Sequence, residues 1–187
     1  MSERCRWAVS HPLLLAYHDE EWGVPTHERT RLYEFLVLEG AQAGLSWLTV
    51  LKRRDAYREA FSGFDPDRVA EWTEADVVRL LQCAGLIRNR SKITSAVANA
   101  RAFRMVEQEF GGFDAYLDRM VGGAPIIHHY REDDQVPPFD ALSQALSRDL
   151  GRRGFRFVGP TICYSYLQAV GVVMDHVTSC FRYQELL

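Results

Sequence analysis

Apolar residues recur at helical spacing along most of this chain, and this periodicity restricts its fold more than any other feature. Leu32, Phe35 and Leu36 lie about one turn apart, and later segments repeat the pattern. No run alternates between apolar and polar residues for long enough to predict a strand. The sequence therefore predicts an all-α protein of about eight to ten short helices.

Capping residues indicate where several of these helices begin and end. Ser, Thr, Asp and Asn side chains accept hydrogen bonds from the first turn of a helix and so favour its N-terminus. Asp65 is followed by Pro66, which suits the first helical position. Gly85 and Gly111 predict helix ends. Residues of the capping type precede the apolar series at Thr26, Ser46, Asp65, Thr73, Asn89 and Asp140.

Two segments lack helical periodicity. Residues 5–25 mix aromatic residues with prolines, and we expect them to form an irregular segment that needs an anchor. Residues 122–138 contain glycines, prolines and a run of charges, so we expect a long surface loop. Neither segment predicts a domain boundary, and the 187 residues suit a single domain, 1–187.

Composition limits the classes of function. No apolar run approaches the ~20 residues of a membrane span, and the first residues do not resemble a signal peptide. We therefore expect a cytoplasmic protein with reduced thiols. The net charge of −3 gives no general attraction to nucleic acid, but basic residues cluster at 52–54, 88–92 and 152–156. A locally basic face of this kind can bind phosphates, although each cluster could equally be a solvated surface.

Cysteine and histidine occur as two pairs at opposite ends of the chain. His176 and Cys180 have a spacing that would place both on one face of a helix, which suits two ligands of a tetrahedral zinc ion. Cys5 and His18 would complete a four-ligand set, which leaves no position for water and therefore indicates a structural metal. The alternative is that these residues are ordinary buried side chains.

A short turn between two helical segments suggests a helix-hairpin-helix over residues 140–171. The turn contains Val158, Gly159 and Thr161, and the N-terminus of the following helix presents backbone N–H groups that can bind a phosphate. Arg153 is one of three arginines beside it. A simple connection between two antiparallel helices would have the same pattern.

Glu39 ends an apolar run and is followed by small residues as far as Trp47. It could lie on the solvated face of a helix, or it could be a pocket carboxylate. Aromatic residues elsewhere lack the spacing of a helical core stripe: Trp7, Tyr17 and Trp22. Aromatic faces with one carboxylate suit a flat, cationic ligand that donates hydrogen bonds, and an alkylated purine is such a ligand.

Long motifs at both ends and in the middle of the chain carry a family resemblance. They are Arg4-Cys5-x-Trp7, Tyr17-His18-Asp19-x-Glu21-Trp22-Gly23-Val24-Pro25, Leu38-Glu39-Gly40-Ala41-Gln42-Ala43-Gly44-Leu45-Ser46-Trp47, Arg153-Gly154-Phe155-x-Phe157-Val158-Gly159 with Thr161-x-Cys163-Tyr164, and Asp175-His176. In these motifs the chain resembles the DNA-3-methyladenine glycosylase I family, a bacterial branch of the helix-hairpin-helix glycosylases. Residues 122–138 do not share in the resemblance.

The resemblance implies an enzyme that flips 3-methyladenine out of alkylated double-stranded DNA and hydrolyses its N-glycosidic bond. It implies that Glu39 and Tyr17 hydrogen-bond the base, that Trp47 stacks on it, and that further aromatic walls come from Trp7 and Trp22. It also implies one structural Zn²⁺ on Cys5, His18, His176 and Cys180, which would join the two ends of the chain. We expect a monomer that acts in the bacterial cytoplasm on nucleoid DNA, with no membrane partner.

The resemblance also assigns DNA contacts. Leu45 would enter the duplex from the turn formed with Gly44 and Ser46. The phosphate backbone would be held by Arg153, Val158, Gly159 and Thr161.

The chain departs from related sequences in the pocket and near its C-terminal end. It has Leu14 where related sequences have a tyrosine. Met174 stands where other members of the superfamily have a catalytic Asp, with Asp175 one position late. We therefore expect no conventional carboxylate assistance to water. No lysine matches a pocket position, which predicts a monofunctional enzyme without lyase activity.

Two alternatives compete with this interpretation. A zinc-stapled helix-hairpin-helix protein could bind DNA without excising bases, but it would have no reason to place Glu39 among aromatic residues. A zinc hydrolase would need an open coordination position, which a four-ligand protein set does not provide.

Overall fold

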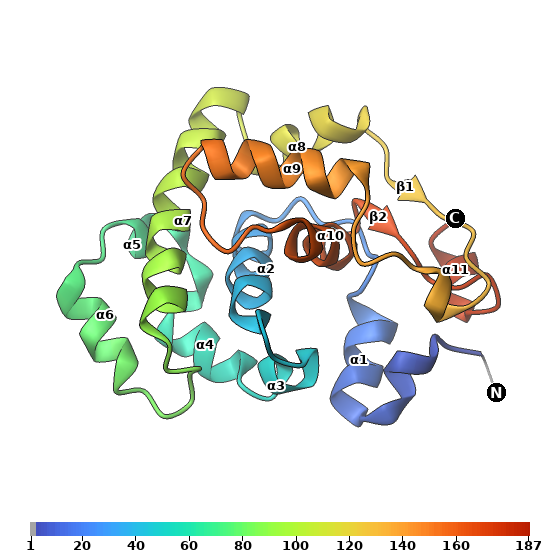
Figure 1. Cartoon of the computed structure of the whole chain (residues 1–187), viewed down its shortest axis with the longest axis horizontal. Helices are drawn as coiled ribbons and strands as arrows, with labels where there is room; N and C mark the ends of the chain where they lie inside the picture. The colour runs from blue at the N-terminus through green and yellow to red at the C-terminus, as the bar shows by residue number, and fades with distance from the viewer. Residues whose placement is uncertain (1–2) are drawn as a thin grey trace.

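The computed structural model describes residues 3–187, and these fold mainly as α-helices (Figure 1). The first half contains η1 (Arg6–Ser10), α1 (Pro12–Glu20), α2 (Arg29–Gln42), α3 (Trp47–Leu51), α4 (Arg54–Ala60), η2 (Ser62–Phe64), α5 (Pro66–Ala70) and α6 (Glu74–Leu81). The second half contains α7 (Arg90–Phe110), α8 (Phe113–Val121), β1 (Ile126–Ile127), η3 (Asp133–Gln135), α9 (Ala141–Arg152), α10 (Pro160–Ala169), β2 (Val173–Met174) and α11 (Phe181–Glu185). The predicted all-α class is confirmed in its main features.

Most of the predicted helix starts are found. Ser46, Asn89 and Asp140 each accept a hydrogen bond from the backbone of the first turn that follows them. Thr73 and Asp76 form a capping box at α6. The first long helix begins later than predicted, because Glu28 rather than Thr26 is its N-cap.

The N-terminal segment is more regular than the sequence predicted. Residues 5–25 were expected to be irregular, but they contain η1 and α1. Helix α1 starts with Pro12 at its first position and with the His11 ring accepting a hydrogen bond from Leu13 N at 3.1 Å. A histidine is not a usual N-cap signal, and the helix is short and not clearly amphipathic. Both properties hid it from a periodicity argument.

Two short strands were also not predicted. Ile126 and Ile127, inside the expected loop 122–138, pair in parallel with Val173 and Met174. Two-residue strands are too short to show the alternation that identifies strands in a sequence. This pairing holds part of the 122–138 segment against the chain that leads to His176.

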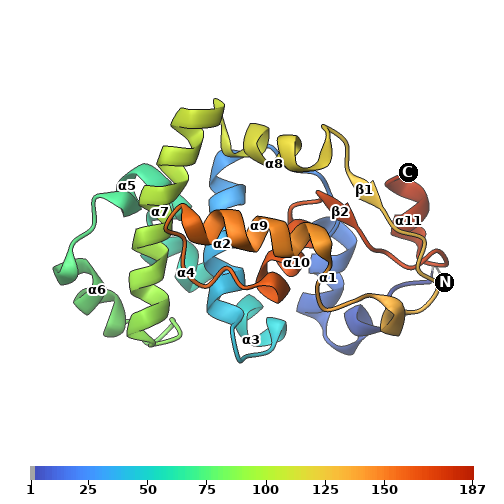
Figure 2. The ribbon, with the colours of Figure 1, turned by 45° about the horizontal axis from the view of Figure 1, so that its top comes forward.

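Helix α2 lies at the centre of the molecule, with α7 on one side and α10 on another (Figures 1 and 2). All ten of its residues from Leu32 to Ala41 are buried. Because α2 is buried on every face, Glu39 near its C-terminus is carried into the interior rather than to solvent. None of the helices over residues 3–187 is both long and apolar enough to cross a membrane.

The two ends of the described chain meet at the same end of the molecule (Figure 1). The backbone of Phe181 donates a hydrogen bond to Glu3 O at 3.0 Å. The segment after β2 therefore packs against η1 and α1, which places His176 and Cys180 near Cys5 and His18.

Candidate active site

A pocket of about 360 Å³ opens beside the C-terminus of α2. Its walls come from η1, α1, α2, α3, the η3 region and α10. The lining residues are Trp7, Tyr17, Trp22, Glu39, Gln42, Trp47, Asp133, Val136, Ser165 and Gln168. The structure thus brings together all five residues that the sequence assigned to base binding.

The aromatic side chains surround the pocket from different elements. Tyr17 on α1 and Trp47, the first residue of α3, lie with ring centroids 5.2 Å apart. Trp7 and Trp22 meet edge to face at 5.0 Å. Flat apolar walls with one open side can accept a planar ring.

Glu39 is the pocket's unusual feature. The residue is 3% exposed, and its Oε2 atom has no hydrogen-bond partner among the described residues. Burial raises the pKa of Glu39 to about 8, because a charged carboxylate loses its hydration there. The buried Nε1 of Trp47 has no acceptor within the described part of the chain either. Unpartnered buried polar atoms in a pocket indicate that a ligand completes them.

Tyr17 shares this environment. Burial, and then the nearby Glu39 charge, raise the pKa of the Tyr17 hydroxyl well above its usual value. The hydroxyl therefore stays protonated and can act as a hydrogen-bond donor to a ligand. Leu14, where a tyrosine was expected from related sequences, is buried on α1 and does not line the pocket.

Half of the residues that line the pocket were not identified from the sequence. Gln42 lies one turn after Glu39, and Ser165 and Gln168 lie one turn apart on α10, so helical spacing could have found these. Asp133 and Val136 come from the 122–138 segment. Nothing in the sequence indicated that they reach the pocket.

The two Cys/His pairs form one buried cluster of possible metal ligands: Cys5, His18, His176 and Cys180. Their ligand atoms lie within 4.8 Å of one another, and all four residues are buried. Individual contacts are 3.2 Å between His176 Nδ1 and His18 Nε2, 3.5 Å between Cys180 Sγ and His18 Nε2, and 3.8 Å between Cys5 Sγ and His176 Nδ1. Tetrahedral zinc bonds of about 2.0–2.3 Å imply ligand separations of about 3.3–3.8 Å, so the donor set fits this metal.

The second nitrogen of each histidine supports the same assignment. His18 Nδ1 lies 2.7 Å from Asp19 Oδ1, and His176 Nε2 donates to Trp22 O at 2.9 Å. Such outer hydrogen bonds fix the ring orientation of metal-binding histidines. One expectation was wrong: His176 and Cys180 do not share a helix, because residues 175–180 form an irregular turn before α11.

The turn between α2 and α3, residues 43–46, is here called the wedge loop. Gly44 has φ +75°, a left-handed conformation that favours glycine. Leu45 beside it is 40% exposed, so its side chain is accessible to a partner. Ser46 caps α3 and is exposed.

The connection between α9 and α10, residues 153–159, is here called the hairpin loop. Gly159 caps α10, and both Gly159 and Thr161 are exposed, while Val158 is half-buried. Arg153 is held in place: its guanidinium contacts Glu109 at 2.6 Å and Asp149 at 2.6 Å. A phosphate contact would have to compete with these ion pairs, whereas Arg156 in the same loop is exposed.

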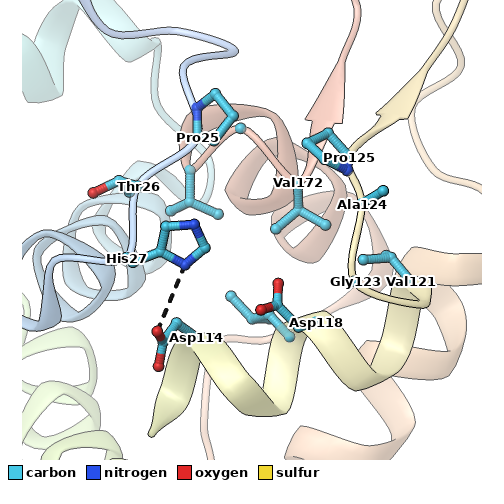
Figure 3. A pocket seen from close by; sticks show the side chains of 13 residues that line it. Pro25, Thr26, His27, Asp114, Asp118, Val121, Gly123, Ala124, Pro125 and Val172 are labelled. Atoms are coloured by element: carbon cyan, nitrogen blue, oxygen red, sulfur yellow. Dashed lines mark ion pairs between the residues drawn. The ribbon is translucent and has the colours of Figure 1, made fainter.

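A second pocket, of about 230 Å³, lies between α8 and residues 25–27 and 170–172 (Figure 3). Its walls are mostly apolar, and an ion pair of 3.5 Å between His27 and Asp114 spans one side. None of the sequence-predicted site residues lines it. The chemistry-bearing side chains therefore gather in the Glu39 pocket.

Comparisons with known proteins agree with this geometry. A profile of the methyladenine glycosylase family matches residues 7–183. The DNA-3-methyladenine glycosylase 1 of Escherichia coli K12 is 48% identical over 181 residues, which cover 97% of each chain. A crystal structure of a 3-methyladenine DNA glycosylase I superimposes with a TM-score of 0.92 at 49% identity, covering 96% of this chain and 98% of the other. The Staphylococcus aureus enzyme, solved to explain 3-methyladenine recognition, has a TM-score of 0.92 at 36% identity and 95% coverage of both chains.

The chain belongs to the methyladenine glycosylase family. It has the fold of the solved 3-methyladenine DNA glycosylases over nearly its whole length. It is accordingly an enzyme, a DNA-3-methyladenine glycosylase that acts on N-glycosidic bonds.

Proposed function

We propose that this enzyme excises 3-methyladenine from alkylated double-stranded DNA by hydrolysis, without lyase activity. The observation that carries the proposal is Glu39, a buried carboxyl group with an unpartnered oxygen inside an aromatic pocket. A group of this kind is costly unless a ligand completes it. A cationic base that donates hydrogen bonds would supply what the pocket lacks.

The lesion itself makes the reaction feasible. Methylation at N3 leaves the adenine positively charged, so the bond between C1′ and N9 breaks with its electron pair moving to N9 and a neutral base departing. Water adds at C1′ and gives up a proton to the solvent. The enzyme must flip the nucleotide, which costs a few kcal/mol and less for a damaged base. It must also bind the cation in preference to normal adenine.

Glu39 provides that preference through its protonation state. With a pKa of about 8, the side chain is mostly neutral at pH 7 in the free enzyme. A cationic base beside it favours the carboxylate, and the new pair forms a charge-assisted hydrogen bond away from water. Neutral adenine gives no such stabilisation. Stacking of the cation on the indole of Trp47 adds a cation–π contact of about 2 kcal/mol when desolvated.

Other groups support a route without a catalytic aspartate or lysine. Met174 is buried in β2, and Asp175 accepts hydrogen bonds from His128, Tyr164 and Gln168 at 2.6–2.7 Å. Its oxygens are thus already engaged. Lysine occurs in the sequence only at 52 and 92. Since neither residue lines the pocket, an imine intermediate has no evident donor there.

We further propose that Cys5, His18, His176 and Cys180 hold one structural Zn²⁺. When bound, the ion would supply a cross-link between the two ends of the chain and no reaction chemistry, since four protein ligands close its coordination. The proposed zinc site is in contact with the pocket walls. The Trp7 ring packs on His18 with centroids 5.4 Å apart, and the Trp22 ring packs on His176 with centroids 4.6 Å apart. Binding of zinc would then stabilise the two aromatic walls formed by Trp7 and Trp22.

For DNA, we propose that Leu45 fills the space left by the flipped nucleotide and that the hairpin loop holds the backbone. The exposed Leu45 and the accessible N-terminus of α10 support these roles. The residues proposed for the wedge are Gly44, Leu45 and Ser46, and those for the hairpin are Val158, Gly159, Thr161 and Arg156. The resemblance assigns Arg153 to the DNA backbone as well, but we propose that it mainly stabilises the hairpin through its contacts with Asp149 and Glu109.

The direct test measures release of free base from methylated duplex DNA by chromatography. The wild-type protein should release 3-methyladenine, and Glu39→Ala should keep its fold but lose the release. A wild-type protein that binds DNA and releases no base would instead identify a DNA-binding protein without excision. Unchanged release by Glu39→Ala would overturn the pocket assignment.

A further inference from the structure

Three residues on one face of α7 bind α2 and the hairpin loop. Lys92, Ala96 and Asn99 follow the i, i+4, i+7 spacing that places side chains in one stripe. Each makes a hydrogen bond to a different part of the site's scaffold. None of the three lines the base pocket.

Lys92 binds the end of α2. Its ammonium group donates to Ala41 O at 2.8 Å and to Ala43 O at 2.6 Å. The last carbonyls of a helix lack intrahelical partners and carry partial negative charge, so a lysine there stabilises the helix end. The chain reaches Gly44 and Leu45 immediately after these carbonyls. Lys92 therefore holds the base of the wedge loop.

The middle of the same face is joined to α2. Tyr33 donates its hydroxyl proton to Ala96 O at 2.8 Å, and both residues are buried. This contact keeps α7 in register with α2. It also means that a shift of Lys92 along α2 would break a second, buried hydrogen bond.

Asn99 binds the hairpin loop. Its amide donates to Arg156 O at 3.0 Å and accepts from Arg156 N at 2.7 Å, and the residue is only 2% exposed. The next residue, Phe157, has φ +52°, which is uncommon for a residue with a bulky side chain. Such a conformation costs about 1–3 kcal/mol and persists only where its surroundings fix it. The paired hydrogen bonds from Asn99 supply that constraint.

The hairpin loop also packs on α2. A Cβ atom placed on Gly40 of α2 would lie 3.5 Å from Phe157 Cβ, so the hairpin loop packs directly on the helix that leads to the wedge loop. The strained Phe157 is thus positioned against α2. Lys92 and Asn99 fix the two sides of this contact from a single helix.

We propose that Lys92 and Asn99 are positioning residues that set the spacing between the wedge loop and the hairpin loop on the DNA duplex. Seven residues of helix separate them by about 10 Å along the axis, which is the rise of about three base pairs. The inference rests on the proposed roles of Leu45 and the hairpin loop. In physical terms, helix α7 is rigid and holds the wedge loop and the hairpin loop at a fixed distance from each other before DNA binds.

Changes to Lys92 and Asn99 should affect excision from duplex DNA more than binding of the free base. The pocket residues do not depend on Lys92 or Asn99 for a direct contact, so free 3-methyladenine should still bind when these are changed. Excision from DNA needs the wedge and the hairpin in one geometry. A misplacement of about 1 Å can reduce a rate by about 100-fold.

The test uses Lys92→Met, which keeps the length of the apolar stem, and Asn99→Leu, which removes both hydrogen bonds at similar size. Arg104→Met is the matched control, because it removes one positive charge from the far end of α7. Tryptophan fluorescence measures binding of free 3-methyladenine, and single-turnover release from methylated duplex measures excision. We expect both test variants to bind free base within about 2-fold of wild type and to lose excision by roughly 10- to 100-fold. The control should retain both.

A double variant tests whether the two residues form one frame. If they set one spacing, the loss in Lys92→Met/Asn99→Leu should be smaller than the product of the single losses, since either change already frees the geometry. Losses that multiply would overturn the shared frame. Unchanged excision in the single variants, or equal losses of base binding and excision, would overturn the positioning role. A wild-type protein that binds free base but releases none from DNA would refute the proposed function instead.

Discussion

Replacing Glu39 with glutamine should make the protein more stable as it makes it less active. The pKa of Glu39 is raised from 4.5 to about 8 in the folded protein because the carboxyl is buried. Between those values the native state holds a proton that the unfolded chain has lost, so the stability of the wild type falls as the pH rises. Glutamine has a similar shape and does not titrate, so the variant avoids this loss.

The size of the effect follows from the raised pKa. Each pH unit between the two values is worth about 1.4 kcal/mol. Moving from pH 5 to pH 7 should therefore cost the wild type about 3 kcal/mol that Glu39→Gln retains. For a chain of this length that difference corresponds to roughly 6–12 °C in the unfolding midpoint.

The assay is thermal unfolding of both proteins at pH 5 and pH 7. The informative quantity is the change in their difference, because other titrating groups contribute equally to both. Glu34→Gln is the matched control: Glu34 is equally buried on α2 but accepts from Arg54 at 2.8 Å, so this variant should lose stability at pH 7. A Glu39→Gln advantage that is the same at pH 5 and pH 7 would refute the reasoning. Excision should fall by roughly 10- to 100-fold, since a charge-assisted hydrogen bond is lost.

Three further predictions concern the ends of the chain and the hairpin. Cys5→Ala should abolish stoichiometric zinc binding, measured by elemental analysis, and lower the unfolding midpoint by roughly 10 °C, because metal affinity is part of the folding free energy. A wild-type protein that is as stable without zinc as with it would contradict this prediction. Arg156→Ala should weaken binding to undamaged and methylated duplex alike and reduce the slope of log affinity against log salt by about 1, measured by titration at several salt concentrations. Arg153→Ala should instead mainly lower the thermal unfolding midpoint, because it removes the ion pair to Glu109 and one of the two ion pairs of Asp149.

Local signals predicted most of the helices. Ser46, Asn89 and Asp140 act within one turn of their own positions, so the sequence around each contains the whole interaction. The β1–β2 pair depends on residues 47 positions apart, Ile126 with Val173, and no local pattern reports such a contact. Helix α1 was missed because its cap is a histidine and its apolar residues are not confined to one face.

The pocket was predicted only where its residues lie in distinctive motifs. Glu39 and the aromatic residues were identified in this way, and the structure brings them together. Asp133 lies beside the pocket, where it accepts a hydrogen bond from Arg6 N at 2.7 Å, and this contact joins residues far apart in the sequence. Lys92 illustrates the limit most clearly: it sits in a basic cluster that looks like an ordinary surface, yet it caps α2 once α7 packs there.

The Cys/His cluster has a consequence for synthesis of the protein. A ribosome makes Cys5 and His18 long before His176 and Cys180, the partners that complete the proposed ligand set. Trp7 and Trp22, which form pocket walls, pack on these histidines. A nascent chain therefore holds an unfinished base site until translation has passed Cys180. Chains that stop before His176 would lack two of the four proposed zinc ligands and the ring that packs on Trp22, so one wall of the base pocket would lose its support.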